Sequence, residues 1–174
     1  MNKQKNVFGK IAFVILFLGL VFIDQFSKYL SIIHLKDSTD IIIIKNILTL
    51  QYLENKGAAF GILQNQRYFF IILTCIFVIV FAYVYNKIPS SKKYLPLKIV
   101  CIFIIAGTIC NFIDRMFRGY VVDFIYIKFI NFPIFNIADM YITISGVVLV
   151  ILFLFVYKDD DLDFISRKKK TEKE

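Results

Sequence analysis

Two aspartates stand at the ends of long apolar runs, where a carboxyl group is costly unless it pairs with another group or does chemistry. Asp114 ends the run that follows Lys98, and Asp139 begins the run that precedes Lys158. At about 1.5 Å per helical residue, Asp114 lies roughly 24 Å and Asp139 roughly 28 Å from these lysines. If the runs cross a membrane in opposite directions, the two carboxyls agree in depth to within about one helical turn.

Two carboxyls at one depth suggest acid–base chemistry. When they share a desolvated site, one keeps its proton while the other is ionised. The ionised group can take a proton from a water molecule that attacks a carbonyl, and the protonated group can donate to the carbonyl oxygen. This aspartic-protease chemistry needs no metal or cofactor. Spacing alone leaves a second interpretation equally open, in which Asp114 pairs with Arg115 at the lipid headgroups and Asp139 caps a helix.

Apolar segments must position these acids. The chain has 174 residues, 59% of them hydrophobic, and a mean hydropathy of +0.70, far more apolar than one soluble core requires. We expect an all-α membrane protein with four transmembrane helices. The predicted helices cover residues 11–33, 68–86, 98–115 and 138–157. No small-residue cleavage site follows the first of them, so we interpret it as a retained anchor.

Flanking charges predict the orientation of these helices. Lysine and arginine number 13 across residues 1–10, 86–98 and 158–174, against eight in the other two connecting segments. Both termini are therefore expected in the cytoplasm. The longer outer segment has a β-branched pattern with a turn at Lys45-Asn46, which predicts a small extracytoplasmic β-sheet at about 40–63. We expect one membrane-embedded domain over 1–160 and a charged cytoplasmic tail over 161–174.

The remaining composition argues against other classes of protein. The net charge of +8 comes from basic residues beside apolar runs, so no nucleic-acid partner is expected. Three cysteines without a CxxC spacing and a single histidine, His34, predict no metal site and no disulfide framework. A small proton-coupled transporter or channel remains the alternative, with Asp24, Asp114 and Asp139 along a proton path.

Five short motifs follow one another along the chain. They are DQFSK at 24–28, NKGAAFG at 55–61, AGTICNFIDR at 106–115, VVDF at 121–124 and FPIFNIAD at 132–139. In this order they resemble the lipoprotein signal peptidase (signal peptidase II) family over nearly the whole chain. The resemblance implies a bacterial inner-membrane aspartyl endopeptidase with its site near the outer face. It also implies that diacylglyceryl-modified prolipoproteins are cleaved before the lipid-bearing Cys. We expect a monomer in contact with membrane lipids and without a cofactor.

Carried over by position, Asp114 and Asp139 match the catalytic aspartates of the family. Asn111 and Asn136 each lie three residues before one of these acids, where an amide could hold the pair or the substrate. Ordinary helix capping is the alternative for both asparagines. Arg115 could neutralise local charge, contact a lipid phosphate, or lie at the interface without a chemical role.

Four other residues are candidates for supporting roles. Asp24 and Lys28 are four residues apart, so they face the same way on a helix and can form a structural clamp near the site. Asn55 and Gly57 could belong to a loop that closes over the substrate, or to a plain turn. Asp123 in the shorter outer segment could orient that segment, and no chemical role is assigned to it.

The chain departs from the usual family pattern in two places. Ala106-Gly107 and Cys110-Asn111 stand where Gly-Gly and Gly-Asn are usual, and both replacements are small enough for close helix packing. Met140-Tyr141 follows Asp139 where smaller residues are common, which is expected to alter the shape of the pocket without altering the reaction.

Overall fold

A computed structural model of the chain describes residues 3–57 and 63–164. Within these ranges four helices are long and apolar enough to cross a membrane, the fourth when a short π-helix, η4 (Leu152–Val156), is counted with it. The helices are α1 (Lys3–Leu35), α2 (Arg67–Lys87), α3 (Leu95–Phe117) and α4 (Ile137–Ile151). Many of their large apolar side chains are exposed, as lipid-facing helices require. The prediction of a multi-pass membrane protein with four apolar helices is confirmed.

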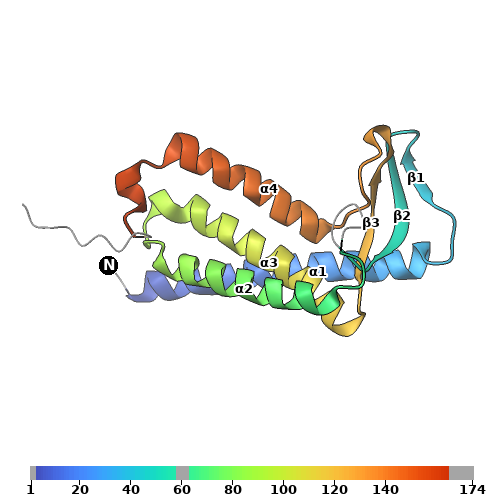
Figure 1. Cartoon of the computed structure of the whole chain (residues 1–174). Helices are drawn as coiled ribbons and strands as arrows, with labels where there is room; N and C mark the ends of the chain where they lie inside the picture. Colours follow the sequence, from blue (N-terminus) through green and yellow to red (C-terminus); the bar gives the residue numbers. More distant parts are fainter. Residues whose placement is uncertain (1–2, 58–62, 165–174) are drawn as a thin grey trace, which may run out of the picture.

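A three-stranded sheet stands at one end of the helices (Figure 1). Its strands, β1 (Ile41–Ile44), β2 (Leu48–Asn55) and β3 (Val121–Ile127), are antiparallel in the order β1-β2-β3. Asn46 adopts a left-handed conformation (φ 63°) in the turn between β1 and β2, at the expected turn position. The small sheet predicted from the longer outer segment is therefore present, and β3 adds an unpredicted strand from the shorter one.

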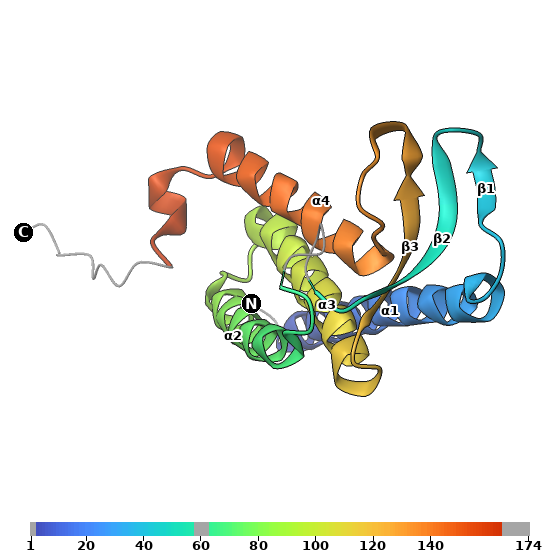
Figure 2. The same cartoon turned by 45° about the vertical axis from the view of Figure 1, so that its right-hand side comes forward.

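The sheet and the helices meet where the chain enters α4. Figures 1 and 2 show the last turns of α1 beside the foot of the sheet and the start of α4 close to β3. Ile125 in β3 forms an isolated bridge with Phe135, just before α4 begins. The short helix η3 (Lys128–Ile130) and the return segment after it thus bring the first turn of α4 against β3.

Helix α3 lies at the centre of the bundle and packs on α1, α2 and α4. Ala106 and Cys110 are fully buried on it. At Gly107 an added Cβ would lie 2.5 Å from the Ala138 carbonyl oxygen, so the first turn of α4 can approach α3 only because residue 107 has no side chain. This close approach sets the distance between α3 and α4 at the sheet end of the bundle.

The end of the bundle opposite the sheet holds the start of α1, the α2–α3 connection and the last described residues. There η2 (Lys92–Tyr94) and η5 (Asp159–Leu162) pack together, and Tyr94 stacks on Tyr157. Residues 58–61 of the NKGAAFG motif and most of the tail predicted over 161–174 lie outside the described residues.

Candidate active site

A cavity of 240 Å³ opens where β2, β3, α3 and α4 converge. Residues 132–135 form an apolar part of its wall. Six of the ten site residues predicted from the sequence line it: Asn55, Gly57, Asn111, Arg115, Asp123 and Asp139. Tertiary structure has therefore collected two carboxyls, two amides and one guanidinium from four separate elements around one space.

Asp139 is held at the start of α4 by a reciprocal cap. The Asp139 backbone N–H donates to Asn136 Oδ1 (3.0 Å), and the Asn136 backbone N–H donates to Asp139 Oδ2 (3.1 Å). The capping interpretation of Asn136 is therefore correct in geometry. The same cap fixes the rotamer of the Asp139 carboxyl at the cavity.

Asp123 faces the cavity from β3. Its Oδ1 accepts from the Asn136 side-chain amide (2.6 Å), and its Oδ2 accepts from the Asn55 side-chain amide (2.9 Å). Asn136 thus donates to both acids, through its side chain to Asp123 and through its backbone to Asp139. One residue holds the two carboxyls of the cavity in a fixed relation.

The environment of Asp123 favours its protonated form. Burial raises the pKa of Asp123 to about 7, and the negative charge of Asp139 adds to this increase. The hydrogen bonds from Asn55 and Asn136 stabilise the ionised form and limit the rise. Asp123 and Asp139 can therefore share a proton near neutral pH.

Asn111 connects the cavity to a buried charge cluster. Its side-chain amide donates to Asp139 Oδ1 (2.8 Å), while its Oδ1 accepts from Lys28 Nζ (2.9 Å). Asn111 was expected to hold the acid pair, and its amide does contact one carboxyl of the cavity. That carboxyl belongs to Asp139 and not to Asp114, three residues after Asn111 in the sequence.

Asp114 lies in a different setting from the one expected. It is fully buried, does not line the cavity, and forms ion pairs with Lys28 (2.9 Å) and with Arg118. Matching depth along two helices fixes only axial position, and the direction of the Asp114 side chain is set by these cations. The carboxyl that faces the cavity with Asp139 is that of Asp123, contrary to the expected pairing of Asp114 with Asp139.

Asp24, Lys28, Asp114 and Arg118 form what we call the charge-balanced cluster. Lys28 pairs with Asp24 at 2.9 Å, as their four-residue spacing predicts, and both side chains are fully buried. Asp24 Oδ1 accepts from the Ala138 backbone N–H (2.8 Å), so the cluster also ties α1 to the first turn of α4. Two acids and two bases keep the cluster neutral, which is how charges persist within a membrane protein.

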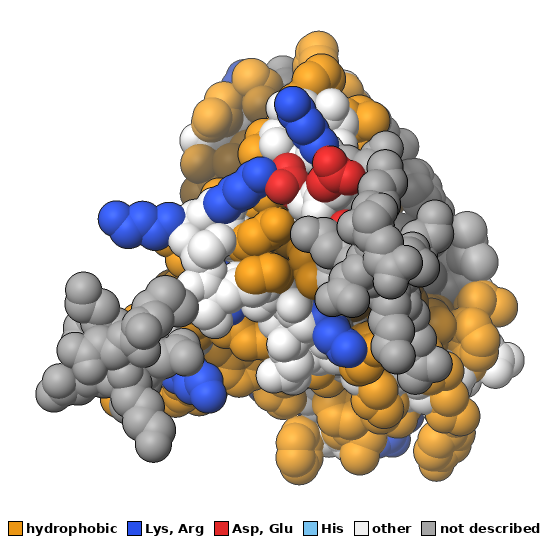
Figure 3. Space-filling model, turned by 90° about the vertical axis from the view of Figure 1, so that its left-hand side faces the viewer, with side chains coloured by type: hydrophobic (Ala, Val, Ile, Leu, Met, Phe, Trp, Pro, Cys, Tyr) orange, Lys and Arg blue, Asp and Glu red, His pale blue; other side chains and the backbone are white. Residues whose placement is uncertain are grey.

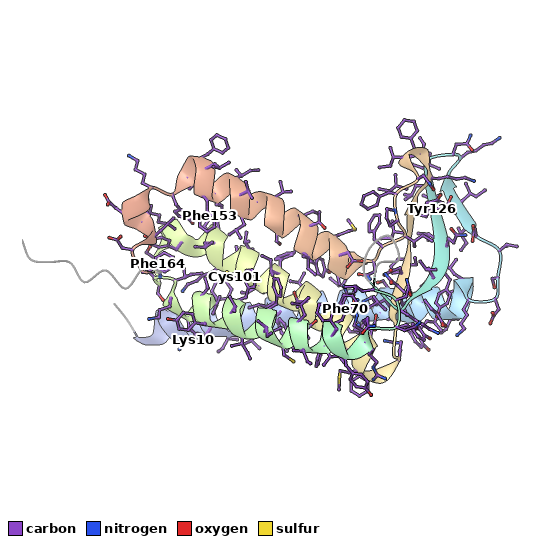
Figure 4. All side chains as sticks on the ribbon, viewed as in Figure 1. Lys10, Phe70, Cys101, Tyr126, Phe153 and Phe164 are labelled. Atoms are coloured by element: carbon purple, nitrogen blue, oxygen red, sulfur yellow. The ribbon has the colours of Figure 1, made fainter. Side chains whose placement is uncertain are left out.

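The loop after β2 is fixed at the rim of the cavity. Asn55 Oδ1 accepts from the Gly57 backbone N–H (2.9 Å), and the Arg115 guanidinium donates to the Gly57 carbonyl oxygen (3.1 Å). The guanidinium also lies 4.7 Å from the ring centroid of Phe70, which Figure 4 places at the sheet end of α2. Arg115 thus holds the loop beside both carboxyls.

Sequence reasoning overlooked Arg118 and Gln25. Arg118 lies four residues after Asp114, and this spacing on a helix signals the ion pair that the structure shows in place of the expected pair with Arg115. Gln25 donates to Asp114 Oδ1 (3.3 Å) and accepts from Arg118, contacts that no spacing rule signals because they join α1 to α3.

The fold and the cavity together define a multi-pass membrane protein in which two carboxyls, held by amides, face one cavity. A family model described as "Signal peptidase (SPase) II" matches residues 16–156. The chain therefore belongs to the signal peptidase II family, a family of aspartic peptidases, and the resemblance of the five motifs is confirmed.

Individual relatives and solved structures agree with this family. A lipoprotein signal peptidase of Streptococcus thermophilus is 43% identical over 146 residues, 84% of this chain and 94% of the relative. One of Streptococcus agalactiae is 44% identical over 142 residues, 82% and 91% of the two chains. A bacterial membrane enzyme structure solved in meso at 2.3 Å resolution matches with a TM-score of 0.71 and 33% identity, covering 94% of each chain. These matches favour the peptidase over the transporter alternative.

Proposed function

We propose that Asp123 and Asp139 are the catalytic pair of this protein, and that Asp114 has a structural role. As a member of the signal peptidase II family, the chain is an aspartic peptidase that removes signal peptides from prolipoproteins. The assignment of the pair rests on one observation: Asp123 and Asp139 face the same 240 Å³ cavity and accept hydrogen bonds from the same residue, Asn136.

In the proposed reaction the pair carries one proton. The ionised carboxyl removes a proton from the attacking water as its oxygen bonds to the scissile carbonyl carbon, and the protonated carboxyl donates to the carbonyl oxygen. Collapse of the tetrahedral intermediate breaks the C–N bond. The carboxyl that took the proton from water gives it to the leaving amine, and the other carboxyl takes back the proton from the hydroxyl as the carbonyl re-forms. Asn111 and Asn136 act as positioning residues, since their amides hold the carboxyls through this proton exchange.

Asp114 is unsuited to this exchange because its charge is already balanced. Lys28 and Arg118 bind its two oxygens, so accepting a proton would leave the buried Lys28 and the partly buried Arg118 with less negative charge around them. In this proposal Asp24, Lys28 and Asp114 have a structural role: they hold α1, α3 and the first turn of α4 together. In that role they support Asp139 through Asn111 and Ala138.

The proposed substrate is a diacylglyceryl-modified prolipoprotein, cut before its lipid-bearing Cys. The cavity lies where the apolar helices end and the sheet begins, and residues 132–135 give it an apolar side. Acyl chains could stay in the bilayer while the peptide bond enters the cavity, and the lipid anchor would raise the effective concentration of the bond. Arg115 and the Asn55–Gly57 turn are placed to contact the substrate backbone. We further propose that the protein acts as a monomer.

We also propose that both termini lie in the cytoplasm and the cavity at the outer face of the bacterial inner membrane. The lysine-rich end of the bundle holds the start of α1 and the last described residues, opposite the sheet. The excess of lysine and arginine there favours a cytoplasmic location.

The function can be tested with the purified protein and a synthetic prolipoprotein peptide. A peptide carrying the diacylglyceryl group should be cut before the modified Cys, as mass spectrometry of both products would show. The same peptide without the lipid should be a much poorer substrate, because its effective concentration at the cavity is lost. Equal cleavage of both peptides, or a cut elsewhere, would contradict the proposed substrate.

A further inference from the structure

A second cavity lies at the opposite end of the bundle, far from the candidate active site. It has a volume of 440 Å³ and lies between the start of α1, the end of α2 and the start of α3. Figure 4 places Lys10 at this end, and Figure 3 looks onto it, where several basic side chains stand among hydrophobic ones. Its polar lining consists of Lys10, Asn86, Ser90, Ser91, Lys92 and Lys98. We call it the inner-end cavity.

An apolar groove continues from this cavity along the helices. The groove has a volume of 400 Å³ and shares four lining residues with the inner-end cavity, among them Phe13 and Tyr85. Its other walls are Val14 and Phe17 of α1 with Ile102 and Ile105 of α3. Because Ile105 lies seven residues beyond Lys98 on α3, the groove reaches about 10 Å further into the membrane than the lysine.

The inner-end cavity has the electrostatic character of an anion site. Its lining, as far as the structure describes it, includes three lysines and no Asp or Glu. Lys98 donates to Ser90 Oγ (3.3 Å) and lies over the Tyr85 ring (5.7 Å), and both of these partners are neutral. Nearby Lys93 differs, because it is paired with Asp161 at 2.5 Å. The described lining of the cavity therefore carries positive charge and no negative charge.

We propose that the inner-end cavity and the groove together bind one anionic phospholipid of the cytoplasmic leaflet. The phosphate would lie among Lys10, Lys98 and the Ser90–Ser91 hydroxyls, and an acyl chain would lie along Phe17 and Ile105. Basic pockets between transmembrane helices on the cytoplasmic side are typical sites for anionic headgroups. Such a lipid would fill the space between α1 and α2, where the groove separates the two helices.

The joined groove distinguishes this site from a general excess of positive charge. Lysines that only determine the orientation of the helices in the membrane need not line a common cavity. An inorganic phosphate would not contact the apolar groove. A lipid satisfies both parts at once, with charge for the lysines and hydrocarbon for the groove. The contribution of the lysines and that of the apolar groove can therefore be tested by separate substitutions.

Native mass spectrometry of the full-length protein released from nanodiscs tests the proposal. With dioleoylphosphatidylglycerol and dioleoylphosphatidylcholine present in equal amounts, the protein should retain the anionic lipid preferentially. Replacing both lysines, Lys10→Gln with Lys98→Gln, should lower this retention about tenfold or more. The matched control, Lys87→Gln with Lys158→Gln, removes the same charge from exposed positions at the same end that line neither cavity, and should leave retention unchanged.

A third variant tests the groove with every lysine in place. Ile105→Trp should fill the groove and lower retention severalfold, and it decides the question if the lysine variant fails to insert. Added inorganic phosphate should not displace the lipid; complete displacement would indicate a free-anion site and overturn the proposal. Equal losses in the lysine variant and its control, or equal retention of the two lipids, would overturn it as well.

Discussion

Two groups of carboxylates lie on either side of Asn111 in this protein, and they differ in the groups that bind them. In the charge-balanced cluster, Asp24 and Asp114 are bound by Lys28 and Arg118. In the cavity, Asp123 and Asp139 accept hydrogen bonds from amides. Asp24, Asp114 and Asp123 are buried and Asp139 is partly buried, so burial alone does not distinguish the two groups.

The partners make the difference. A cation next to a carboxylate stabilises its charge and so keeps it ionised, whereas an amide holds its position and allows it to gain or lose a proton. Asn111 lies between the two groups, since it contacts Lys28 on one side and Asp139 on the other. The charge-balanced cluster can therefore fix the cavity in place without entering the reaction.

The largest expected effect is a loss of activity when a carboxyl of the cavity, and not one of the charge-balanced cluster, is replaced. Asp123→Asn and Asp139→Asn should each lower kcat by at least about 10³-fold. An Asn side chain cannot exchange a proton, so each variant keeps only one of the two carboxyls that the reaction needs. Each substitution replaces one accepted hydrogen bond by an unfavourable contact, so the free energy of unfolding should fall by only about 1–2 kcal/mol. Turnover of a lipidated peptide and thermal denaturation in detergent measure the two quantities.

Asp160→Asn provides the control for these substitutions, because Asp160 is an exposed aspartate of η5 outside both groups. It should change neither quantity. Substantial turnover by Asp123→Asn would remove Asp123 from the catalytic pair.

The next effect should appear mainly in stability. Asp114→Asn leaves the positive charges of Lys28 and Arg118 with too few acids around them and should cost about 3–5 kcal/mol of unfolding free energy. Protein that still folds should keep kcat within about tenfold of the wild type, because the cavity pair is intact. The double variant Asp114→Asn with Arg118→Gln restores charge balance and should be more stable than Asp114→Asn alone. If Asp114→Asn instead folds normally and is inactive, Asp114 belongs to the reaction after all.

A smaller effect concerns the approach of α3 to α4. Gly107→Ala places a Cβ against the Ala138 carbonyl, and we expect a loss of about 1–3 kcal/mol in unfolding free energy. The displaced first turn of α4 carries Asp139, so kcat should fall by up to about 10²-fold. Gly146→Ala is the matched control, since an added Cβ there meets no atom within 4 Å. Equal effects of the two variants would show that helix approach does not set the geometry of the pair.

The smallest effect is a pH dependence of the cavity pair. Because burial and Asp139 raise the pKa of Asp123 to about 7, the shared proton is present below that pH and is lost above it. The ratio kcat/KM should therefore fall about tenfold per pH unit above about pH 7. Asn55→Ala removes a hydrogen bond that lowers the Asp123 pKa, so the descending limb should move to higher pH. A limb that moves to lower pH would contradict this electrostatic account of Asp123.

The fold could be predicted from the sequence to a large extent. Apolar runs of about 20 residues have one favourable arrangement in lipid, and the helices of the structure match the predicted segments to within a few residues at most ends. The main exception is α1, which begins at Lys3 instead of near residue 11. Strand β3 was not predicted, although VVDFIYI is rich in β-branched and aromatic residues, because its partner strand β2 lies more than 60 residues earlier in the chain.

The sequence by itself determined which side chains are available for chemistry and at what depth each helical one lies. It could place Asp114 and Asp139 at one level because the rise per residue of a helix is constant. It could not decide which acid meets Asp139, because the direction of a side chain depends on its neighbours from other elements. Lys28 of α1 draws Asp114 away from the cavity, while the pairing of β3 with β2 brings Asp123 into it. Only the tertiary structure decided this, since contacts between distant segments leave no periodic trace in the sequence.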